Sequence, residues 1–248
     1  MKLRILYRQV FDIAPNLFSE FLKLEEEMLY TEEKSGYPIA RKYRPLASYI
    51  DCGSRIYERV FESIADFSRL ISKRYLDKDF AKLDARRFKL VNWTRNELYY
   101  VDSGTPIPTW MQGISSQPFS EELIKQGLPM NDSWICCKRD AGEIGVMYRQ
   151  IQCVPKSCWG EKFEQELRSD KVEFEQGNPL PIRLRSMFGP ENSHIRVSER
   201  EYPSYERLCN IHESFINEDS VLDSRVMDAE ARRQAFFTWE KEELYFVD

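Results

Sequence analysis

The stretch WTRNELYYVD, residues 93–102, occurs a second time as WEKEELYFVD, residues 239–248. Six of the ten positions are identical, and two more exchange similar residues, Arg95 with Lys241 and Tyr100 with Phe246. A match of this length at the ends of two long segments indicates that the chain contains an internal duplication.

Four further short segments recur in the same order ahead of each copy, at an offset of 141 to 148 residues. They are residues 84–87 with 230–233, 57–60 with 205–208, 36–38 with 177–179, and 6–10 with 147–151. The nearly constant offset predicts two related modules, residues 1–102 and 141–248. Residues 103–140 have no counterpart and form a connector, for which we predict a short helix and a strand.

The composition is that of a folded globular protein, with 31% charged and 42% hydrophobic residues among 248. The net charge of −5 and the pI near 5.4 disfavour a general nucleic-acid binder, which needs a basic face. The N-terminus lacks the apolar run of a secretory signal, and no apolar stretch approaches the length of a membrane span. We therefore expect a cytoplasmic protein, in which the six cysteines are reduced thiols.

Periodicity predicts the same order of elements in each module. In the first module we expect a half-buried strand over residues 2–13, a helix over 16–30, a loop over 31–44 and a helix over 53–75. A hairpin follows, with strands over 88–93 and 98–101 and a turn over 94–97. A continuous helix is the rival interpretation there, but Val91, Thr94 and Tyr99 favour strands.

In the second module the corresponding segments are a strand over 144–154, a helix from Pro155 to about Arg168, a loop over 177–204, a helix over 205–216 and a final hairpin. The predicted fold class is therefore α+β. Each module is a small, mostly antiparallel sheet packed with helices, and the two modules form a pseudo-dimer.

Two arginines, Arg8 and Arg149, occupy equivalent positions in the middle of predicted strands. A buried arginine needs an acidic partner. We expect Glu97 and Glu243, in the neighbouring hairpins, to supply the carboxylates. This pairing would be structural.

The usual catalytic signatures are absent: there is no GxSxG, GxxxxGK[ST], GxGxxG or HExxH. We therefore predict no cofactor, no metal and no enzymatic activity. The remaining nominees for catalysis are His212, Glu213 and Cys209, which lie within about one turn on a predicted helix. A Cys–His dyad normally joins distant segments, so this spacing is more simply incidental.

Residues that are not repeated are better candidates for function, because a duplicated pair often divides its roles. The candidates for partner binding are two tryptophans and a methionine in the connector and four glutamates on or after the first helix, whose outer face is expected to carry Glu25, Glu26 and Glu27. They are Trp110, Met111, Trp134, Glu25, Glu26, Glu32 and Glu33.

An acidic protein without catalytic motifs fits a bacterial immunity protein that neutralises a cognate basic toxin, such as a nuclease, through this acidic surface. The alternatives are an enzyme with its site in a cleft between the modules, or a nucleic-acid or nucleotide binder. The binder would use Arg86 and Arg87 with Arg232 and Arg233.

Overall fold

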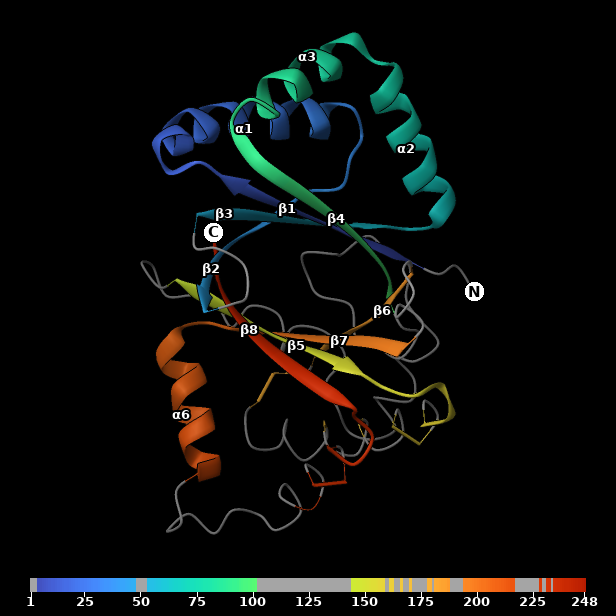
Figure 1. Cartoon of the computed structure of the whole chain (residues 1–248), viewed down its shortest axis with the longest axis vertical. Helices are drawn as coiled ribbons and strands as arrows, with labels where there is room; N and C mark the ends of the chain where they lie inside the picture. The colour runs from blue at the N-terminus through green and yellow to red at the C-terminus, as the bar shows by residue number, and fades with distance from the viewer. Residues whose placement is uncertain are drawn as a thin grey trace. The chain divides into compact units, whose positions relative to one another are not determined.

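The computed structural model of the protein (Figure 1) describes residues 4–47, 53–101, 144–158, 161–162, 166, 170, 178–179, 181–187, 194–216, 228, 231–232 and 234–248. Its strands are β1 (Ile5–Ile13), β2 (Arg41–Ala47), β3 (Ser54–Phe61), β4 (Val91–Val101), β5 (Gly145–Cys153), β6 (Ile182–Ser186), β7 (Ile195–Tyr202) and β8 (Trp239–Val247). Its helices are α1 (Phe18–Lys34), α2 (Ile64–Leu76), α3 (Lys78–Arg87) and α6 (Tyr205–Ile216), with short 3-10 turns η1 (Pro15–Leu17) and η3 (Lys156–Cys158).

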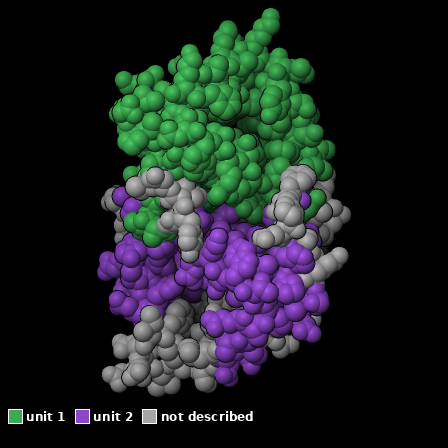
Figure 2. Space-filling view, in the orientation of Figure 1, with its two compact units in different colours: residues 1–100, 247–248 green, residues 101–246 purple. Residues whose placement is uncertain are grey.

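The chain divides into two compact units (Figure 2): unit 1 is Met1–Tyr100 with Val247–Asp248, and unit 2 is Val101–Phe246. In unit 1, β1 pairs antiparallel with both β3 and β4, and β2 pairs with β3. Helices α1, α2 and α3 cover one face of these strands (Figure 1). The predicted module boundaries and the connector stay a prediction, because residues 102–143 lie outside the described part of the chain.

Unit 2 repeats the strand pairing of unit 1. In unit 1, Ile5 of β1 lies opposite Phe61 of β3, and in unit 2 Val146 of β5 lies opposite Tyr202 of β7. Both pairs are related by the same shift of 141 residues, so the duplication extends to the register of the sheet. Strand β6 then pairs with β7 as β2 pairs with β3.

The eight strands follow the order β1-β3-β2-β8-β5-β7-β6-β4 in one closed barrel. The predicted fold, two small sheets packed with helices as a pseudo-dimer, is therefore wrong. A closed sheet has no unpaired strand edges, whereas two open sheets would each leave edges exposed. The error arose because several strands were assigned to loops, helices or turns.

The supposed closing hairpins are single strands. Strand β4 continues through residues 94–97, and β8 is equally unbroken. Asn96 and Glu97 were taken for turn residues because they are polar. In the strand they contact residues of the neighbouring β1. Asn96 accepts hydrogen bonds from Tyr7 (2.9 Å) and Gln9 (3.3 Å), and Glu97 lies opposite Arg8.

Strands also replace parts of the predicted loops and of one helix. Residues 54–61 form β3 rather than the start of a helix. The helix begins only at Ile64, behind an N-cap in which Ser63 Oγ accepts from the amide of Asp66 at 3.1 Å. The loops predicted over 31–44 and 177–204 contain parts of α1 and β2 and all of β6 and β7. The strand over 2–13, the helix over 16–30, the strand over 144–154 and the helix over 205–216 are confirmed in type.

Residues 57–60 and 205–208 are therefore not equivalent, because the first segment lies in β3 and the second in α6. The register assigns Glu58 and Arg59 to Glu199 and Arg200, which are 141 residues later.

Strand β1 is buried on both faces, not half-buried with a charged outer face as predicted. On the face turned away from Phe11 and α1, Arg8 is 1% exposed and its Nη1 lies 2.8 Å from Oε1 of Glu58, which is fully buried. Glu97 lies 3.5 Å from Nε of Arg8, as expected.

Unit 2 has the same ion pair, in which Arg149 Nη1 lies 2.8 Å from Glu199 Oε1 and Arg149 Nε lies 3.7 Å from Glu243. The predicted pairings of Arg8 and Arg149 with the repeated WxxxELY segments are confirmed, with a second and closer carboxylate from the neighbouring strand.

Breaking the Arg8–Glu58 pair from one side should destabilise the protein strongly. We expect Arg8→Met to lower the free energy of unfolding by about 3–5 kcal/mol, because Glu58 would keep a buried charge without its counter-ion. The double variant Arg8→Met/Glu58→Leu should recover most of that loss, as measured by urea unfolding. Lys82→Ala, in an exposed pair with Asp79, is the control and should change stability by less than about 1 kcal/mol. If the double variant lost as much unfolding free energy as the two single variants together, the pairing of Arg8 with Glu58 would not explain their stability.

Candidate functional site

Helix α1 presents two carboxylates on its buried face. Phe21, Glu25, Met28 and Glu32 follow one another at steps of four, three and four residues, the period of one helix face, and all are buried. Glu25 is 7% exposed and Glu32 is 3% exposed, so neither lies on the expected acidic surface. Glu26 and Glu33, which directly follow them in sequence, are exposed.

A cavity lies in unit 1 between this face of α1 and the strands. Its lining is largely apolar and aromatic, with carboxylates, an amide and two arginines among the apolar groups. The lining residues are Gln9, Phe11, Phe21, Glu25, Met28, Leu29, Glu32, Tyr57, Arg59 and Arg87. The cavity encloses about 260 Å³ including its open mouth, of which about 10 Å³ admits the centre of a water-sized sphere. It therefore holds about one water as it stands, and a ligand would have to displace flexible side chains such as Met28.

Tyr57 and Glu25 form a hydrogen-bonded pair in the wall of the cavity. The Tyr57 hydroxyl donates to Oε1 of Glu25. Burial raises the pKa of Tyr57 well above its ordinary value, and the negative charge of Glu25 raises it further. Two cations flank the carboxylate: Arg55 Nε at 3.7 Å and Lys42 Nζ at 3.9 Å. Tyr57 thus keeps its proton, while Glu25 is a carboxylate held among donors.

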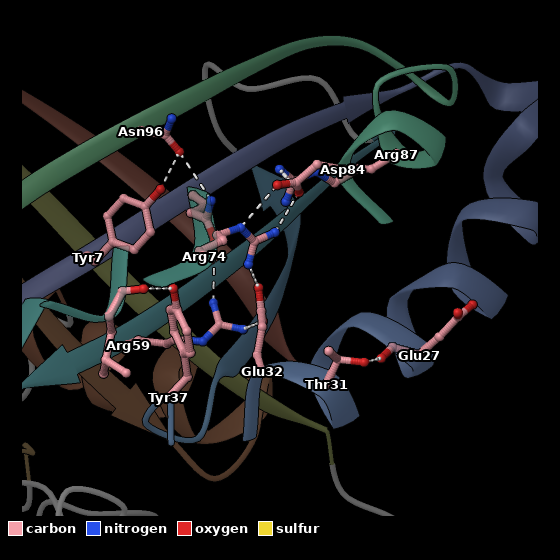
Figure 3. Close-up of polar contacts among 12 residues, drawn as sticks. Tyr7, Glu27, Thr31, Glu32, Tyr37, Arg59, Arg74, Asp84, Arg87 and Asn96 are labelled. Atoms are coloured by element: carbon pink, nitrogen blue, oxygen red, sulfur yellow. Dashed lines mark hydrogen bonds and ion pairs between the residues drawn. The ribbon is translucent and has the colours of Figure 1, made fainter. Parts of the chain in front are cut away.

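Three arginines and two carboxylates form a second, connected group in unit 1 (Figure 3). Glu32 accepts from Arg59 of β3 through Oε2 and from Arg74 of α2 through Oε1. Asp84 of α3 accepts from Arg74 Nη2 at 2.5 Å and lies 2.8 Å from Arg87 Nη2. This group joins all three helices to the strand β3.

Arg87 of α3 is buried, and only some of its guanidinium donors have hydrogen-bond partners. The side chain is 7% exposed, its guanidinium lies 4.7 Å from the ring centre of Phe11, and its Nε and Nη1 have no hydrogen-bond partner. Burial lowers the pKa of Arg87, and Asp84 offsets that effect in part. Arg59 likewise has an Nε without a hydrogen bond, although its Nη2 is bound to Glu32.

Unit 2 has its own buried group of three cations and two carboxylates, in which Lys162 is bonded to Glu166. Arg183 of β6 donates to Glu166 through Nε at 2.9 Å and also to Asp170 through Nη2. Arg200, the counterpart of Arg59, lies 3.4 Å from Asp170 and donates through Nε to the Pro179 carbonyl at 2.9 Å. Among the described residues, neither Arg183 nor Arg200 has a buried nitrogen that lacks a hydrogen bond.

The nominees for catalysis do not meet in this cavity. His212 on α6 is half-buried and packs edge-on against Tyr148 of β5, with ring centres 5.6 Å apart. Cys209 is half-buried, while Glu213 is exposed. The helix thus places His212 against an aromatic ring of its own unit.

The other sequence candidates are dispersed. Arg86 is 54% exposed and paired with Glu27 at 2.7 Å, whereas its neighbour Arg87 is buried, so the two do not form an exposed basic pair. Arg232 is exposed. The proposed partner-binding residues Trp110, Met111 and Trp134 and the arginine at position 233 lie outside the described residues.

In the described part of the chain, no group of three or more His, Cys, Asp or Glu side chains could hold a metal ion. No helix there is both long enough and apolar enough to cross a membrane. Cys153, Cys158 and Cys209 are free thiols, as predicted, and the other three cysteines lie outside the described residues.

Comparison with known proteins identifies the fold. No protein-family profile and no curated protein matches the sequence. A candidate monooxygenase from Fusobacterium nucleatum is similar in structure, with a TM-score of 0.61 and 9% identity over 99% of this chain and 93% of that one. An anthrone oxidase-like protein has a TM-score of 0.58 and 11% identity over 100% and 92%. A mutant chlorite dismutase from Candidatus Nitrospira defluvii has a TM-score of 0.56 and 8% identity over 99% and 91%.

These similarities overturn the functional prediction. The expectation of a non-enzymatic immunity protein rested on the absence of catalytic motifs and on an acidic surface. The chain instead has, over nearly its whole length, a fold that it shares with proteins named as monooxygenase, oxidase-like and dismutase. Glu25 and Glu32, which were assigned to the acidic surface, are buried and bonded.

One signal in the sequence could have located the cavity. The order Phe21, Glu25, Met28, Glu32 places two carboxylates in phase with buried apolar residues. In the sequence this phase was masked by the run Glu25–Glu26–Glu27, which resembles a solvated face. The arginines that neutralise these carboxylates are far away in sequence, so spacing alone could not reveal them.

Tyr7 should make stability fall at high pH. Its hydroxyl donates to Asn96, and burial raises its pKa to about 12 although three nearby arginines lower it. An unfolded tyrosine ionises near about pH 10, so this contribution is intact below about pH 10 and is lost as pH rises through about 12. In urea unfolding, wild type should lose about 2–3 kcal/mol more than Tyr7→Phe across that window. Tyr75→Phe, at a position that is 82% exposed, is the control and should behave as wild type. Parallel curves for wild type and Tyr7→Phe would contradict the assignment.

Proposed function

We propose that the protein is an oxidoreductase that oxidises a small, largely apolar substrate in the cavity of unit 1. The observation that carries this proposal is the buried Tyr57–Glu25 pair beside an aromatic-lined cavity. The structurally similar proteins, a candidate monooxygenase, an anthrone oxidase-like protein and a chlorite dismutase, are all named for oxidation–reduction chemistry.

Glu25 is the group proposed to accept a proton from the substrate. A substrate with an acidic C–H or O–H would lose that proton to the Glu25 carboxylate and become an anion. The anion would then react with dioxygen, the co-substrate of a monooxygenase. A C–H carbon of the substrate would be oxidised to C=O with one oxygen atom, and the other oxygen atom would be reduced to water, taking the two protons that the substrate loses. Arg55 and Lys42 lie 3.7 Å and 3.9 Å from the carboxylate oxygens of Glu25. Tyr57, whose pKa lies well above its ordinary value, holds the carboxylate in position by donating a hydrogen bond to it.

The walls of the cavity favour an aromatic substrate. Phe11 lies 5.5 Å from Tyr57 in an edge-to-face arrangement and 6.0 Å from Phe21, measured between ring centres. Aromatic rings pack well against one another at such distances. Water is largely excluded from this space, which strengthens the interaction of the carboxylate with a bound proton donor.

Oxygen consumption tests the proposal directly. Anthrone and single-ring phenols serve as the first substrates, because an anthrone oxidase-like protein has this fold. Wild type should consume oxygen in the presence of at least one of them. Glu25→Gln should lower the rate by about 10²–10⁴-fold, the usual contribution of a positioned proton acceptor. Glu26→Gln, on the exposed side of the same helix, is the matched control and should keep the wild-type rate.

Two outcomes would overturn the proposal. If no compound in the panel raised oxygen consumption by wild type above the buffer rate, the oxidoreductase assignment would be wrong. If Glu25→Gln folded and kept the wild-type rate, Glu25 would not be the proton acceptor. Circular dichroism of each variant confirms that a lost rate does not reflect unfolding.

A further inference from the structure

The buried ionic group of unit 1 has one positive charge more than it has negative charges. It contains three arginines, Arg59, Arg74 and Arg87, and two carboxylates, Glu32 and Asp84. Three positive charges and two negative charges leave an excess of one. A buried charge that has no counter-ion is costly, so a single negative charge from elsewhere would stabilise this group.

The excess charge is localised at Arg87. Arg74 donates to both carboxylates, and Arg59 is bound to Glu32. Arg87 shares Asp84 with Arg74 and has two buried nitrogens, Nε and Nη1, without a hydrogen bond. Among the described residues, no other side chain has two buried nitrogens in this state. Such donors cost free energy unless something else, a ligand or a water, accepts from them.

The side chains that carry these donors lie in the lining of the cavity. Arg87 and Arg59 both line it, beside Phe11 and Phe21. The guanidinium of Arg87 lies over the Phe11 ring, which fixes its plane next to the apolar part of the space. An occupant that satisfies both features needs an anionic group at Arg87 and an apolar, flat body against the phenylalanines.

We propose that Arg87, assisted by Arg59, binds the anionic group of a small aromatic monoanion, such as a single-ring carboxylate, in the cavity of unit 1. The inference rests on the proposed function only in making this ligand the substrate or a substrate mimic. The carboxylate would accept from the Arg87 nitrogens and remove the excess of positive charge, while the ring, which is larger than the present space, would displace the flexible Met28 side chain and pack on Phe11 and Phe21. Charge-assisted hydrogen bonds of this kind are stronger than neutral ones.

Calorimetric titration of the whole protein with benzoate tests the inference. Wild type should bind one benzoate per chain, and benzyl alcohol, which has the ring without the charge, should bind at least about tenfold more weakly. Inorganic phosphate should not compete, because it has no apolar body. Arg87→Met should lower the affinity for benzoate by about 10–100-fold, and Arg87→Lys by less, because lysine keeps the charge without the planar group.

The neighbouring arginine provides a matched control. Arg86 lies on the same turn of α3, is exposed and pairs with Glu27, so Arg86→Met should bind benzoate as wild type does. Without ligand, Arg87→Met should be as stable as wild type or more stable, because it removes an excess buried charge and leaves Asp84 bound to Arg74.

Three results would overturn the inference: no binding of benzoate by wild type, equal affinity in Arg87→Met, or marked destabilisation of Arg87→Met without ligand. Marked destabilisation would show that Arg87 has a structural role. If Arg87→Lys then bound benzoate as tightly as wild type, the planar donors of Arg87 would not be needed for binding. Binding is measured without turnover. If the protein bound benzoate but consumed no oxygen, the oxidoreductase assignment would be wrong and the anion site would stand. If it consumed oxygen but did not bind benzoate, the anion site would be wrong and the oxidoreductase assignment would stand.

Discussion

The structure depends on the rule that a charge taken out of water must be paired. Arg8 and Glu58 meet at 2.8 Å on facing strands, and Arg149 and Glu199 meet through the same atoms at the same distance. A shift of either strand by one residue would turn these side chains to the opposite face and separate the pair. The repeated WxxxELY segment supplies a further carboxylate to each arginine. Buried ionic pairing therefore accounts for much of what the two halves have kept in common.

The halves differ on the helix side of their strands, and there the candidate site lies. Unit 1 has an aromatic cavity, the Glu25 carboxylate hydrogen-bonded to Tyr57, and Arg87, whose Nε and Nη1 have no hydrogen-bond partner. In unit 2 the counterpart of Arg59, Arg200, is bonded to an aspartate and a backbone carbonyl. A duplicated scaffold can keep one copy for stability while the other binds a ligand. Glu25 and Glu32 of α1 then lie against buried arginines inside the protein, whereas Glu26 and Glu33 of the same helix are exposed.

Sequence patterns predicted the duplication, four elements by type, and the partners of Arg8 and Arg149. The predictions were wrong where buried polar residues occur in strands, because polar residues are also typical of loops and turns. Asn96 and Glu97 lie in the middle of a strand because Tyr7, Gln9 and Arg8 require them, and Glu58 and Arg59 disturb the alternation that would have identified β3. The site was missed for the same reason, since Glu25 and Glu32 are balanced by arginines of other elements. Closure of the barrel depends on long-range pairing that no local pattern records.

The central claim is that the buried charge of Arg87 is completed by an anionic ligand inside unit 1. The most direct measurement is a crystal structure of the protein grown with 4-iodobenzoate, in which anomalous scattering locates the iodine. The account predicts the carboxylate within hydrogen-bonding distance of Arg87 Nη1 and the iodinated ring among Phe11, Phe21 and Met28. A cavity that holds only water beside Arg87 at saturating ligand, with iodine absent or bound elsewhere, would contradict it.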